Sequence, residues 1–339
     1  MRAFPTMERA FSASVTDLLE AGIEPEIANR FLQERLHIHP DQELEKMLIA
    51  EVKAVTRADE TYPSLLAQLY DPPAILFYRG TLPDQTHKHI AVVGSREVTA
   101  YGARAIETIV GPLAESGVVI VSGLAYGVDA LAHRVTIDRR GITLAVLGTG
   151  VDAASIYPSA NRTLASQILA SGGAIISEFP IGTPPLKHHF PIRNRVIAGL
   201  CHGTLVIEAA QKSGSLITAR AALEAGRDVY AIPGLFDAPL SEGPNNLIKM
   251  GATLVTQASD IVSSIENPKS IQETKSFVYE ARNETERILL SFLNTQPTHI
   301  DEIAHACILS IETISSTLTL LEMKGIIRHE GGRYYVRIS

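Results

Sequence analysis

Ile90-Ala91-Val92-Val93-Gly94-Ser95-Arg96 is the stretch that decides the fold of this chain. Its four apolar residues run without alternation, which predicts a strand covered on both faces, as in a parallel sheet. The run then ends in a glycine, a hydroxyl and a cation. Glycine lets the backbone approach a ligand, and the free N–H groups where the next helix begins favour phosphate oxygens. The stretch therefore predicts a buried strand with an anion-binding end.

Five further apolar runs repeat this pattern, and segments with helical apolar spacing separate them. The runs are Val118–Val121, Thr143–Leu147, Ala174–Ile176, Thr204–Ile207 and Val229–Ile232. Before them, Ile75–Tyr78 follows a proline-interrupted stretch and is interpreted as an extra strand. Alternating strands and helices are typical of an α/β protein with a doubly wound, mostly parallel sheet. We predict this fold class for residues 56–265.

Two smaller parts flank the predicted sheet. Residues 1–55 are predicted to form a small helical module. The module is acidic, because residues 1–51 carry ten Asp and Glu against five Lys and Arg. On the other side, residues 266–280 are largely polar and contain Pro268, which predicts a linker.

Residues 281–339 have the outline of a winged-helix domain. Three helical runs lead into a predicted hairpin whose turn is Gly331-Gly332. The expected recognition helix, Ile311–Met323, contains no Lys or Arg, and the first cation after it is Lys324. A helix that reads a DNA groove normally needs cations and base-reading amides. The sequence therefore favours a protein-contact or packing role for this domain over duplex reading.

Loops rich in small residues follow several of the predicted strands. They are Ser122-Gly123, Gly148-Thr149-Gly150 and Ser213-Gly214-Ser215. Because the carboxyl ends of parallel strands meet at one edge of a sheet, we expect these loops to converge there with Gly94-Ser95-Arg96. The chain has no Gly-x-x-x-x-Gly-Lys-Ser/Thr, and its first turn has no Gly-x-Gly-x-x-Gly. These absences argue against a P-loop nucleotidase and against an NAD dehydrogenase.

A local reversal of charge marks the stretch from Lys187 to Arg195. The chain has a formal net charge of -7, yet this stretch holds Lys187, Arg193 and Arg195 and no acid. Cations match phosphate oxygens, and the ring of Phe190 offers a face on which a base can stack. The pattern indicates nucleic acid, although Phe190 could instead be a core residue with the cations as a solvated rim. The net acidity of the chain argues against a protein that coats duplex DNA.

Cys201 and Cys307 are the only cysteines of the chain. They are too few and too far apart for a disulfide scaffold or a Cys-based metal site, so both are expected to be small buried hydrophobes in a reducing compartment. No apolar run approaches the roughly 18 residues of a membrane span, and the N-terminus shows no export signal. We expect a cytoplasmic protein with no membrane contact, no cofactor and no metal ion.

Catalytic alternatives are few. Asp129 and His133 are four residues apart on one predicted helix face and could be metal ligands or an acid/base pair, but a helix cap or a buried hydrogen-bonded pair is the favoured interpretation. His188 and His189 are adjacent, so on most backbones they point apart. Glu208, at the end of a predicted strand, is the best lone candidate for a general base. No residue is assigned as catalytic.

Many short motifs of the chain, taken in order, resemble those of the DprA (Smf) DNA-processing family. They are Val93-Gly94-Ser95-Arg96, Ser122-Gly123-Leu124-Ala125, Gly127-Val128-Asp129, Ala132-His133, Ala145-Val146-Leu147-Gly148-Thr149-Gly150, Tyr157-Pro158, Ser177-Glu178-Phe179-Pro180, Phe190-Pro191-Ile192-Arg193-Asn194-Arg195, Glu208-Ala209, Ser213-Gly214-Ser215 and Pro233-Gly234. The resemblance covers about residues 62–258, and both flanking parts are common in that family.

The resemblance implies an extended Rossmann-like domain that binds single-stranded DNA without sequence preference, forms a homodimer and helps load the RecA recombinase during natural transformation and homologous recombination. It implies no catalysis. The DNA-binding residues that it implies are Gly94, Ser95, Arg96, Ser122, Gly123, Lys187, Phe190, Arg193, Asn194, Arg195, Ser213, Gly214 and Ser215. The cations of this set would hold phosphates, and Phe190 would stack on a base or wedge against it.

A second resemblance points to another class of protein. The sheet region is also similar to LOG-type nucleotide phosphoribohydrolases, which act on nucleoside monophosphates and carry a Pro-Gly-Gly-x-Gly-Thr-x-x-Glu loop. The corresponding stretch here, Gly199 to Glu208, lacks the Pro-Gly-Gly and has one more residue before the acid. A one-residue offset on a strand turns a side chain to the other face. Such an enzyme is the alternative to a DNA-binding mediator.

Overall fold

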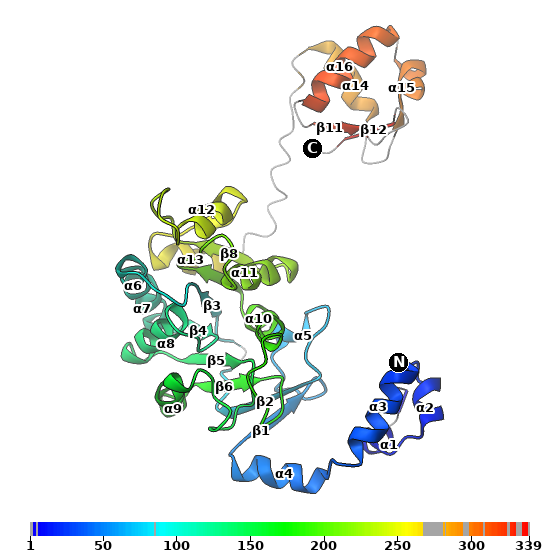
Figure 1. Ribbon diagram of the computed structural model, residues 1–339. Helices are drawn as coiled ribbons and strands as arrows, with labels where there is room; N and C mark the ends of the chain where they lie inside the picture. The colour runs from blue at the N-terminus through cyan, green and yellow to red at the C-terminus, as the bar shows by residue number, and fades with distance from the viewer. Residues whose placement is uncertain are drawn as a thin grey trace. The chain divides into compact units, whose positions relative to one another are not determined.

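The structure is a computed structural model that describes residues 3–337 except 5, 85, 267–280, 282, 294–297, 308, 324–325 and 330–333. The chain divides into two compact units, residues 1–266 and residues 267–339 (Figure 1). The predicted linker, residues 266–280, lies outside the described residues apart from its first residue. None of the described helices combines the length and the apolar content that crossing a membrane requires.

A nine-stranded sheet forms the centre of the first unit, in the strand order β1-β2-β6-β5-β4-β3-β7-β8-β9 (Figure 1). The strands are β1 (Lys53–Thr56), β2 (Ile75–Gly80), β3 (His89–Val93), β4 (Val119–Ser122), β5 (Thr143–Leu147), β6 (Ala174–Ser177), β7 (Gly203–Val206), β8 (Asp228–Ala231) and β9 (Thr253–Leu254). The strands from β6 to β9 in this order are parallel, whereas β1 and β2 pair antiparallel. The predicted mostly parallel sheet is confirmed.

Helices cover both faces of this sheet, so the predicted double winding is also confirmed. One face carries α5 (Ser64–Ala67), α10 (His189–Gly199) and α11 (Ser215–Glu224). The other face carries α6 (Ala100–Ala105), α7 (Gly111–Glu115), α8 (Val128–Asp138), α9 (Arg162–Ala170) and α13 (Ala258–Glu266). A π-helical turn, η1 (Ile106–Val110), joins α6 to α7; a 3-10 turn, η2 (Ser159–Asn161), precedes α9; and α12 (Glu242–Lys249) connects β8 to β9.

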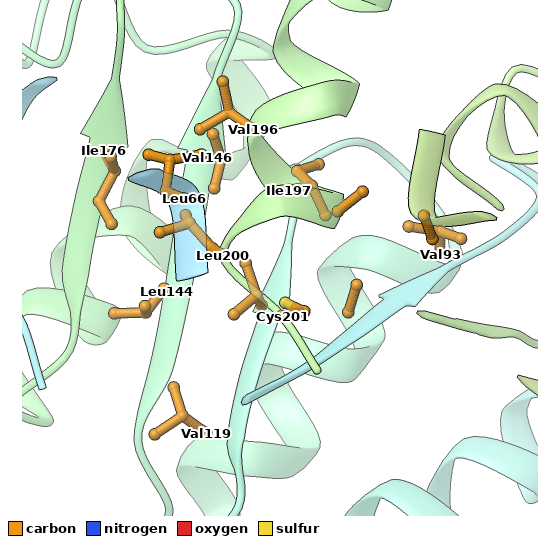
Figure 2. Packing of buried hydrophobic residues seen from close by; sticks show 14 of the residues in the cluster. Leu66, Val93, Val119, Leu144, Val146, Ile176, Val196, Ile197, Leu200 and Cys201 are labelled. Carbon is orange, nitrogen blue, oxygen red and sulfur yellow. The ribbon is translucent and has the colours of Figure 1, made fainter. Parts of the chain in front are cut away.

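Alternate residues of β3 face opposite layers of the unit. Ala91 and Val93 belong to one buried cluster, whereas Ile90 and Val92 belong to another. Figure 2 shows the first cluster, in which α10 lays its apolar side chains over the strands and Cys201 lies among them as a buried hydrophobe. Burying one large apolar side chain contributes about 1.5–3 kcal/mol. Packing on both faces therefore buries β3 completely inside the first unit.

Four helices precede the sheet, in the region predicted to be a helical module. They are α1 (Met7–Phe11), α2 (Val15–Glu20), α3 (Pro25–Arg35) and α4 (Pro40–Ile49). Ser14 and Asp17 form a capping box at the start of α2, and Leu18 lies in a small apolar core. The module was predicted to end at residue 55, but this position lies inside β1, which pairs with β2. The sequence did not reveal β1 because Val55 is its only buried side chain.

The second unit has the predicted winged-helix fold. Its elements are α14 (Glu284–Phe292), β10 (Thr298–His299), α15 (Ile300–Ala306), α16 (Ile311–Met323), β11 (Ile327–His329) and β12 (Tyr334–Arg337). Strand β12 lies between β10 and β11 in an antiparallel sheet. Leu289, Ile303 and Leu318 are among the buried side chains that join its helices. The predicted turn Gly331-Gly332 and Lys324 lie outside the described residues.

Candidate nucleic-acid interface

A hollow of about 680 Å³ lies at the carboxyl edge of the sheet in the first unit. Loops that follow β3, β4, β5 and β7 line it together with α10 and α11, as expected where parallel strands end side by side. We call this hollow the strand-end pocket. Its lining residues are Val93, Gly94, Arg96, Ala125, Asp129, Tyr157, Pro185, Lys187, Phe190, Pro191, Arg193, Asn194, Ile197, Ser213, Gly214, Ser215, Ile217 and Thr218.

Most of the residues predicted to bind DNA line this pocket. They are Gly94, Arg96, Lys187, Phe190, Arg193, Asn194, Ser213, Gly214 and Ser215. The remaining four, Ser95, Ser122, Gly123 and Arg195, are outside the lining. The strand-end loops therefore converge as the sequence predicted, while the DNA contacts of the individual residues stay predictions.

Two cations of the pocket are exposed. Arg96 follows β3 and Lys187 precedes α10, so they reach the pocket from different elements. Within the described part of the chain, neither side chain makes a hydrogen bond or an ion pair. Their N–H donors are therefore available to anionic oxygens.

The third cation of the lining, Arg193, is only 6% exposed. Its Nη1 donates to the carbonyl of Gly123 at 2.7 Å and also to the carbonyl of Val146. A Cβ atom on Gly123 would lie 2.4 Å from the Arg193 guanidinium. Gly123, which the family resemblance assigned to DNA binding, thus makes room for this side chain. Through these contacts Arg193 ties the ends of β4 and β5 to α10.

Asp129 supplies the opposite charge beneath the pocket. Its carboxylate accepts hydrogen bonds from the N–H groups of Gly123 at 3.1 Å and Ala125 at 3.3 Å. Burial raises the pKa of Asp129, and the nearby Arg193 opposes this shift. Burial likewise lowers the pKa of Arg193 to about 10, and Asp129 opposes that change. The two buried charges therefore stabilise each other.

His133 lies one helical turn after Asp129 and is fully buried. The hydroxyl of Thr143 donates to the carbonyl of Ile120 at 2.7 Å, so the Nδ1–H of His133 donates to that hydroxyl at 2.6 Å. Burial, and then the charge of Arg193, lowers the pKa of His133 to about 3, which keeps the imidazole neutral. Asp129 and His133 are thus each buried and hydrogen-bonded, but to different partners, so the structure does not show the pair that the sequence suggested. Among the residues that the structure describes, no cluster of His, Cys, Asp and Glu could hold a metal ion.

Arg195 meets partners outside the pocket. It forms an ion pair with Glu178, and its Nη1 donates to the carbonyl of Asp71 at 2.6 Å. Burial raises the pKa of Glu178, and Arg195 opposes that shift. Arg195 thereby connects α10 to the loop after β6 and to the segment before β2. A DNA contact through Arg195 would have to compete with this ion pair.

Two of the predicted serines shape their own loops. Ser122 is fully buried, and its hydroxyl donates to the carbonyl of Val92 at 2.6 Å. The hydroxyl of Ser95 donates to the carbonyl of Glu97 at 3.0 Å, and its N–H donates to the carbonyl of Glu208 at 2.7 Å. These hydroxyl protons are therefore used by the backbone in this conformation.

The turn Ser213-Gly214-Ser215 leads directly into α11. The hydroxyls of Ser213 and Ser215 lie 2.8 Å apart, and the Ser215 N–H donates to the Ser213 hydroxyl at 3.3 Å. Asn194 of α10 donates to the carbonyl of Gly214 at 3.3 Å. The start of α11 is thereby held against α10. The positive end of the α11 dipole adds to the field of the nearby cations.

Two aromatic rings lie together in the lining. The ring centroids of Phe190 and Tyr157 are 5.9 Å apart, and their planes are tilted by 49°. Phe190 is partly buried, whereas Tyr157 is 46% exposed. Sequence reasoning did not assign Tyr157 to the site, although the motif Tyr157-Pro158 was the signal that could have found it. His189, for which no role was expected, is stacked on Phe179 with a centroid distance of 3.9 Å.

Glu208, the candidate general base, is hydrogen-bonded to the N-cap residue of a helix. Its carboxylate accepts hydrogen bonds from the N–H of Thr99, at 2.9 Å, and from the Thr99 hydroxyl, and Thr99 is the N-cap of α6. The side chain of Glu208 is buried, and a Cβ atom on Gly102 would lie 2.3 Å from its Oε2. Both carboxylate oxygens thus order the start of α6. This geometry does not favour the nucleotide hydrolase.

Two family models match the chain. The model described as DNA recombination-mediator protein A matches residues 53–266. The model described as DprA winged helix domain matches residues 274–333. Together they cover the sheet of the first unit and most of the second unit.

Individual proteins are similar over the same region. DNA processing protein DprA of Streptococcus pneumoniae is 47% identical over 208 residues, which is 61% of this chain and 72% of that protein. Protein Smf of Escherichia coli is 47% identical over 207 residues, and the match covers only 55% of its length. Protein Smf of Synechocystis is 33% identical over 371 residues, covering 98% of this chain and 92% of the relative.

Solved structures show the same fold. The X-ray structure of DprA from Streptococcus pneumoniae is similar with a TM-score of 0.63 and 42% identity, over 71% of this chain and 82% of that one. DNA processing protein A from Helicobacter pylori, described as having a unique single-stranded DNA binding mode, is similar with a TM-score of 0.56 and 28% identity. That match covers 64% of this chain and 97% of the other.

Proposed function

This chain belongs to the DNA recombination-mediator protein A (DprA) family, and on that premise we propose that it binds single-stranded DNA without sequence preference in the strand-end pocket. The observation that carries the proposal is the meeting of two exposed cations, Arg96 and Lys187, with an aromatic lining in one hollow. The Helicobacter pylori relative, which is described as binding single-stranded DNA, supports it.

The cations would hold the phosphates of the strand. Arg96 offers a planar fork of donors and Lys187 a flexible point charge, and both suit phosphate oxygens. Gly94, Asn194 and the Ser213-Gly214-Ser215 turn would complete this contact from the neighbouring loops. Each phosphate that is neutralised releases counterions, so the affinity would fall as the salt concentration rises.

The aromatic lining would receive a base. Phe190 lies between the cations of the basic stretch, and a ring can stack on any base because every base has a π-face. A strand held by phosphate contacts and stacking is bound with little regard to its sequence. No step in this scheme breaks or forms a covalent bond, and the engagement of Glu208 with α6 supports a role without catalysis.

Family membership supports three finer parts of the proposal. The bound strand would be passed to the RecA recombinase during natural transformation and homologous recombination. The chain would act as a homodimer, and it would work in the cytoplasm, where RecA and incoming strands meet. The flanking helical module and the winged-helix unit are given no part in strand binding, because the first is acidic and α16 carries no Lys or Arg.

The experiment that tests the proposed function is a salt titration with fluorescence anisotropy. An unstructured single-stranded oligonucleotide and its duplex are compared over a range of salt concentrations. We expect tighter binding of the single strand, with a log–log salt slope of about -0.7 per phosphate contact. Equal affinity for the two forms, or no binding of the single strand, would refute the proposal.

A further inference from the structure

We propose that Tyr157 is a second base-stacking residue of the strand-end pocket and that its ring makes the site selective for unpaired bases. The inference rests on the proposed function, because it assigns a residue to that same site. Tyr157 lines the hollow from the loop after β5, whereas Phe190 lines it from α10. The two rings therefore reach one place from separate elements.

Phe190 is enclosed by its neighbours. A Cβ atom on Gly148 would lie 3.2 Å from its ring, so the backbone of that loop packs directly against it. The Cζ atom of Arg193 lies 5.9 Å from the ring centroid, and the Tyr157 centroid lies at the same distance. With these three neighbours in place, only part of the Phe190 ring remains open to a ligand.

Tyr157 is the more open ring of the pair, at 46% exposure. Its loop is nevertheless held in place. The adjacent Ile156 is buried, and the side-chain amide of Asn161 donates to the carbonyl of Leu124 at 2.8 Å. A ring that is exposed but attached to a fixed loop loses little conformational freedom when a base stacks on it.

Arg96 lines the same pocket as Tyr157 and lies within reach of the same nucleotides. Tyr157 follows β5 and Arg96 follows β3, and these strands are separated only by β4. Neighbouring strands are about 4.8 Å apart, so the two loops start on the order of 10 Å from each other. A phosphate at Arg96 and a base at Tyr157 can therefore belong to one short stretch of strand.

This arrangement gives Tyr157 a different effect on single strands and on duplexes. In a duplex, each base is covered on both faces by its stacked neighbours, so the ring cannot reach it, whereas phosphates are available in both forms. Stacking on Tyr157 would therefore add affinity only for unpaired bases. Losing the ring should lower the ratio of single-strand to duplex affinity.

The test compares Tyr157→Ala, Tyr157→Phe and the control Tyr70→Ala in the full chain. Tyr70 is fully exposed and lies outside the pocket lining. We expect Tyr157→Ala to weaken binding of the single strand about tenfold. Its duplex affinity and its salt slope should stay unchanged, because stacking releases few counterions. Tyr157→Phe and Tyr70→Ala should bind like the unchanged protein.

The outcomes distinguish stacking by the Tyr157 ring from a contact of its hydroxyl and from no role at all. If Tyr157→Phe loses as much affinity as Tyr157→Ala, the hydroxyl is responsible and the stacking role is overturned. If Tyr157→Ala binds the single strand normally, the residue has no role, while the proposed function still stands on the unchanged protein. If the unchanged protein fails to bind the single strand, the proposed function itself fails.

A second measurement reports stacking directly. An oligonucleotide that carries 2-aminopurine changes its emission when the fluorescent base is stacked on a ring. We expect the same change with the unchanged protein and with Tyr157→Phe, and a smaller change with Tyr157→Ala at saturating protein. An identical change with all three proteins would overturn the assignment of Tyr157.

Discussion

Arg193 belongs to the lining of the strand-end pocket, where backbone carbonyls of Gly123 and Val146 accept its hydrogen bonds and Asp129 provides the opposite charge. Removing a buried cation leaves its hydrogen-bond acceptors and the nearby opposite charge uncompensated, which costs on the order of 3 kcal/mol. Arg193 therefore contributes to the stability of the pocket before any ligand arrives. Arg96 and Lys187 have no comparable partners within the described residues.

We expect Arg193→Met to lower the free energy of unfolding by about 3 kcal/mol, because two buried carbonyls would lose their donor and Asp129 would lose the nearby opposite charge. Adding Asp129→Asn should restore part of the loss, since the remaining group is then neutral. Urea unfolding of the unchanged protein, the two single variants and the double variant measures the coupling. If the double variant loses as much stability as the two single variants together, Arg193 and Asp129 do not interact and the prediction is wrong.

Replacing an exposed cation, Arg96 or Lys187, should change DNA binding and leave the free energy of unfolding nearly unchanged. Arg96→Met and Lys187→Met are expected to change the free energy of unfolding by less than about 0.5 kcal/mol. Each should make the salt slope of single-strand binding shallower by about 0.7, because one phosphate contact is lost. Arg220→Met on α11 is the control, since its side chain is 81% exposed and pairs with Glu224. Unchanged slopes in both pocket variants would argue against phosphate contacts at these residues.

The sequence predicted the basic stretch but not the partner of each cation. Residues 193 and 195 are two apart on α10, so their side chains leave the helix about 200° apart. The partners that they meet, Asp129 and Glu178, come from other elements and become neighbours only in the folded chain. The residues next to Arg193 and Arg195 in the sequence therefore do not predict these contacts. Arg193 and Arg195 could therefore be recognised as cations, but the buried position of Arg193 could not be foreseen.

At the scale of elements, glycine sets how closely α10 approaches the strand ends. We expect Gly123→Ala to lower the free energy of unfolding by about 1–3 kcal/mol, because its Cβ would displace the pinned Arg193 guanidinium. It should also weaken DNA binding, since the loop before α8 would shift. Gly214→Ala is the control for the unfolding measurement only, because its turn is also proposed to contact DNA; Gly214 has a φ of -61° and no atom within 4 Å of an added Cβ. If both variants lower the midpoint of thermal unfolding equally, the close contact between Gly123 and Arg193 does not explain the effect.

The central strands were predictable because their residues are apolar on both faces. Every residue of β3, β4 and β5 is buried, so periodicity and composition agree. The edge strands β1 and β9 were not predictable, because they lack this burial. Strand β1 buries only one side chain, and β9 consists of two exposed residues. Their pairing comes from the sheet that is already formed beside them and not from their own sequences.

At the scale of the whole molecule, two buried histidines make its stability depend on pH. Burial lowers the pKa of His89 to about 4 and, with the nearby Arg193, that of His133 to about 3. In the unfolded chain both have a pKa of about 6.5. Below that value the unfolded state binds protons that the folded state does not, so stability falls as the pH falls from about 6.5 toward 4. Each histidine contributes about 1.4 kcal/mol per pH unit in this range.

We expect urea midpoints to decrease between pH 6.5 and 5, above the range in which most carboxylates titrate. His133→Asn keeps a donor for Thr143 but cannot be protonated, so its midpoint should depend less steeply on pH. His37→Asn, at an exposed position, is the control and should keep the original dependence. Equal pH dependence in all three proteins would contradict the contribution of His133.

The position of β2 in the sheet has a consequence for the order of events during synthesis. Phe77 of β2 pairs with Ser177 of β6, one hundred residues further along the chain. At roughly 5–20 residues per second, the ribosome needs roughly 5–20 s to produce that partner. Until then the antiparallel pair of β1 and β2 has an open strand edge, which is a template for pairing with other chains. During this interval, between the synthesis of β2 and that of β6, we expect the open edge of β2 to be a site at which the nascent chain can pair wrongly.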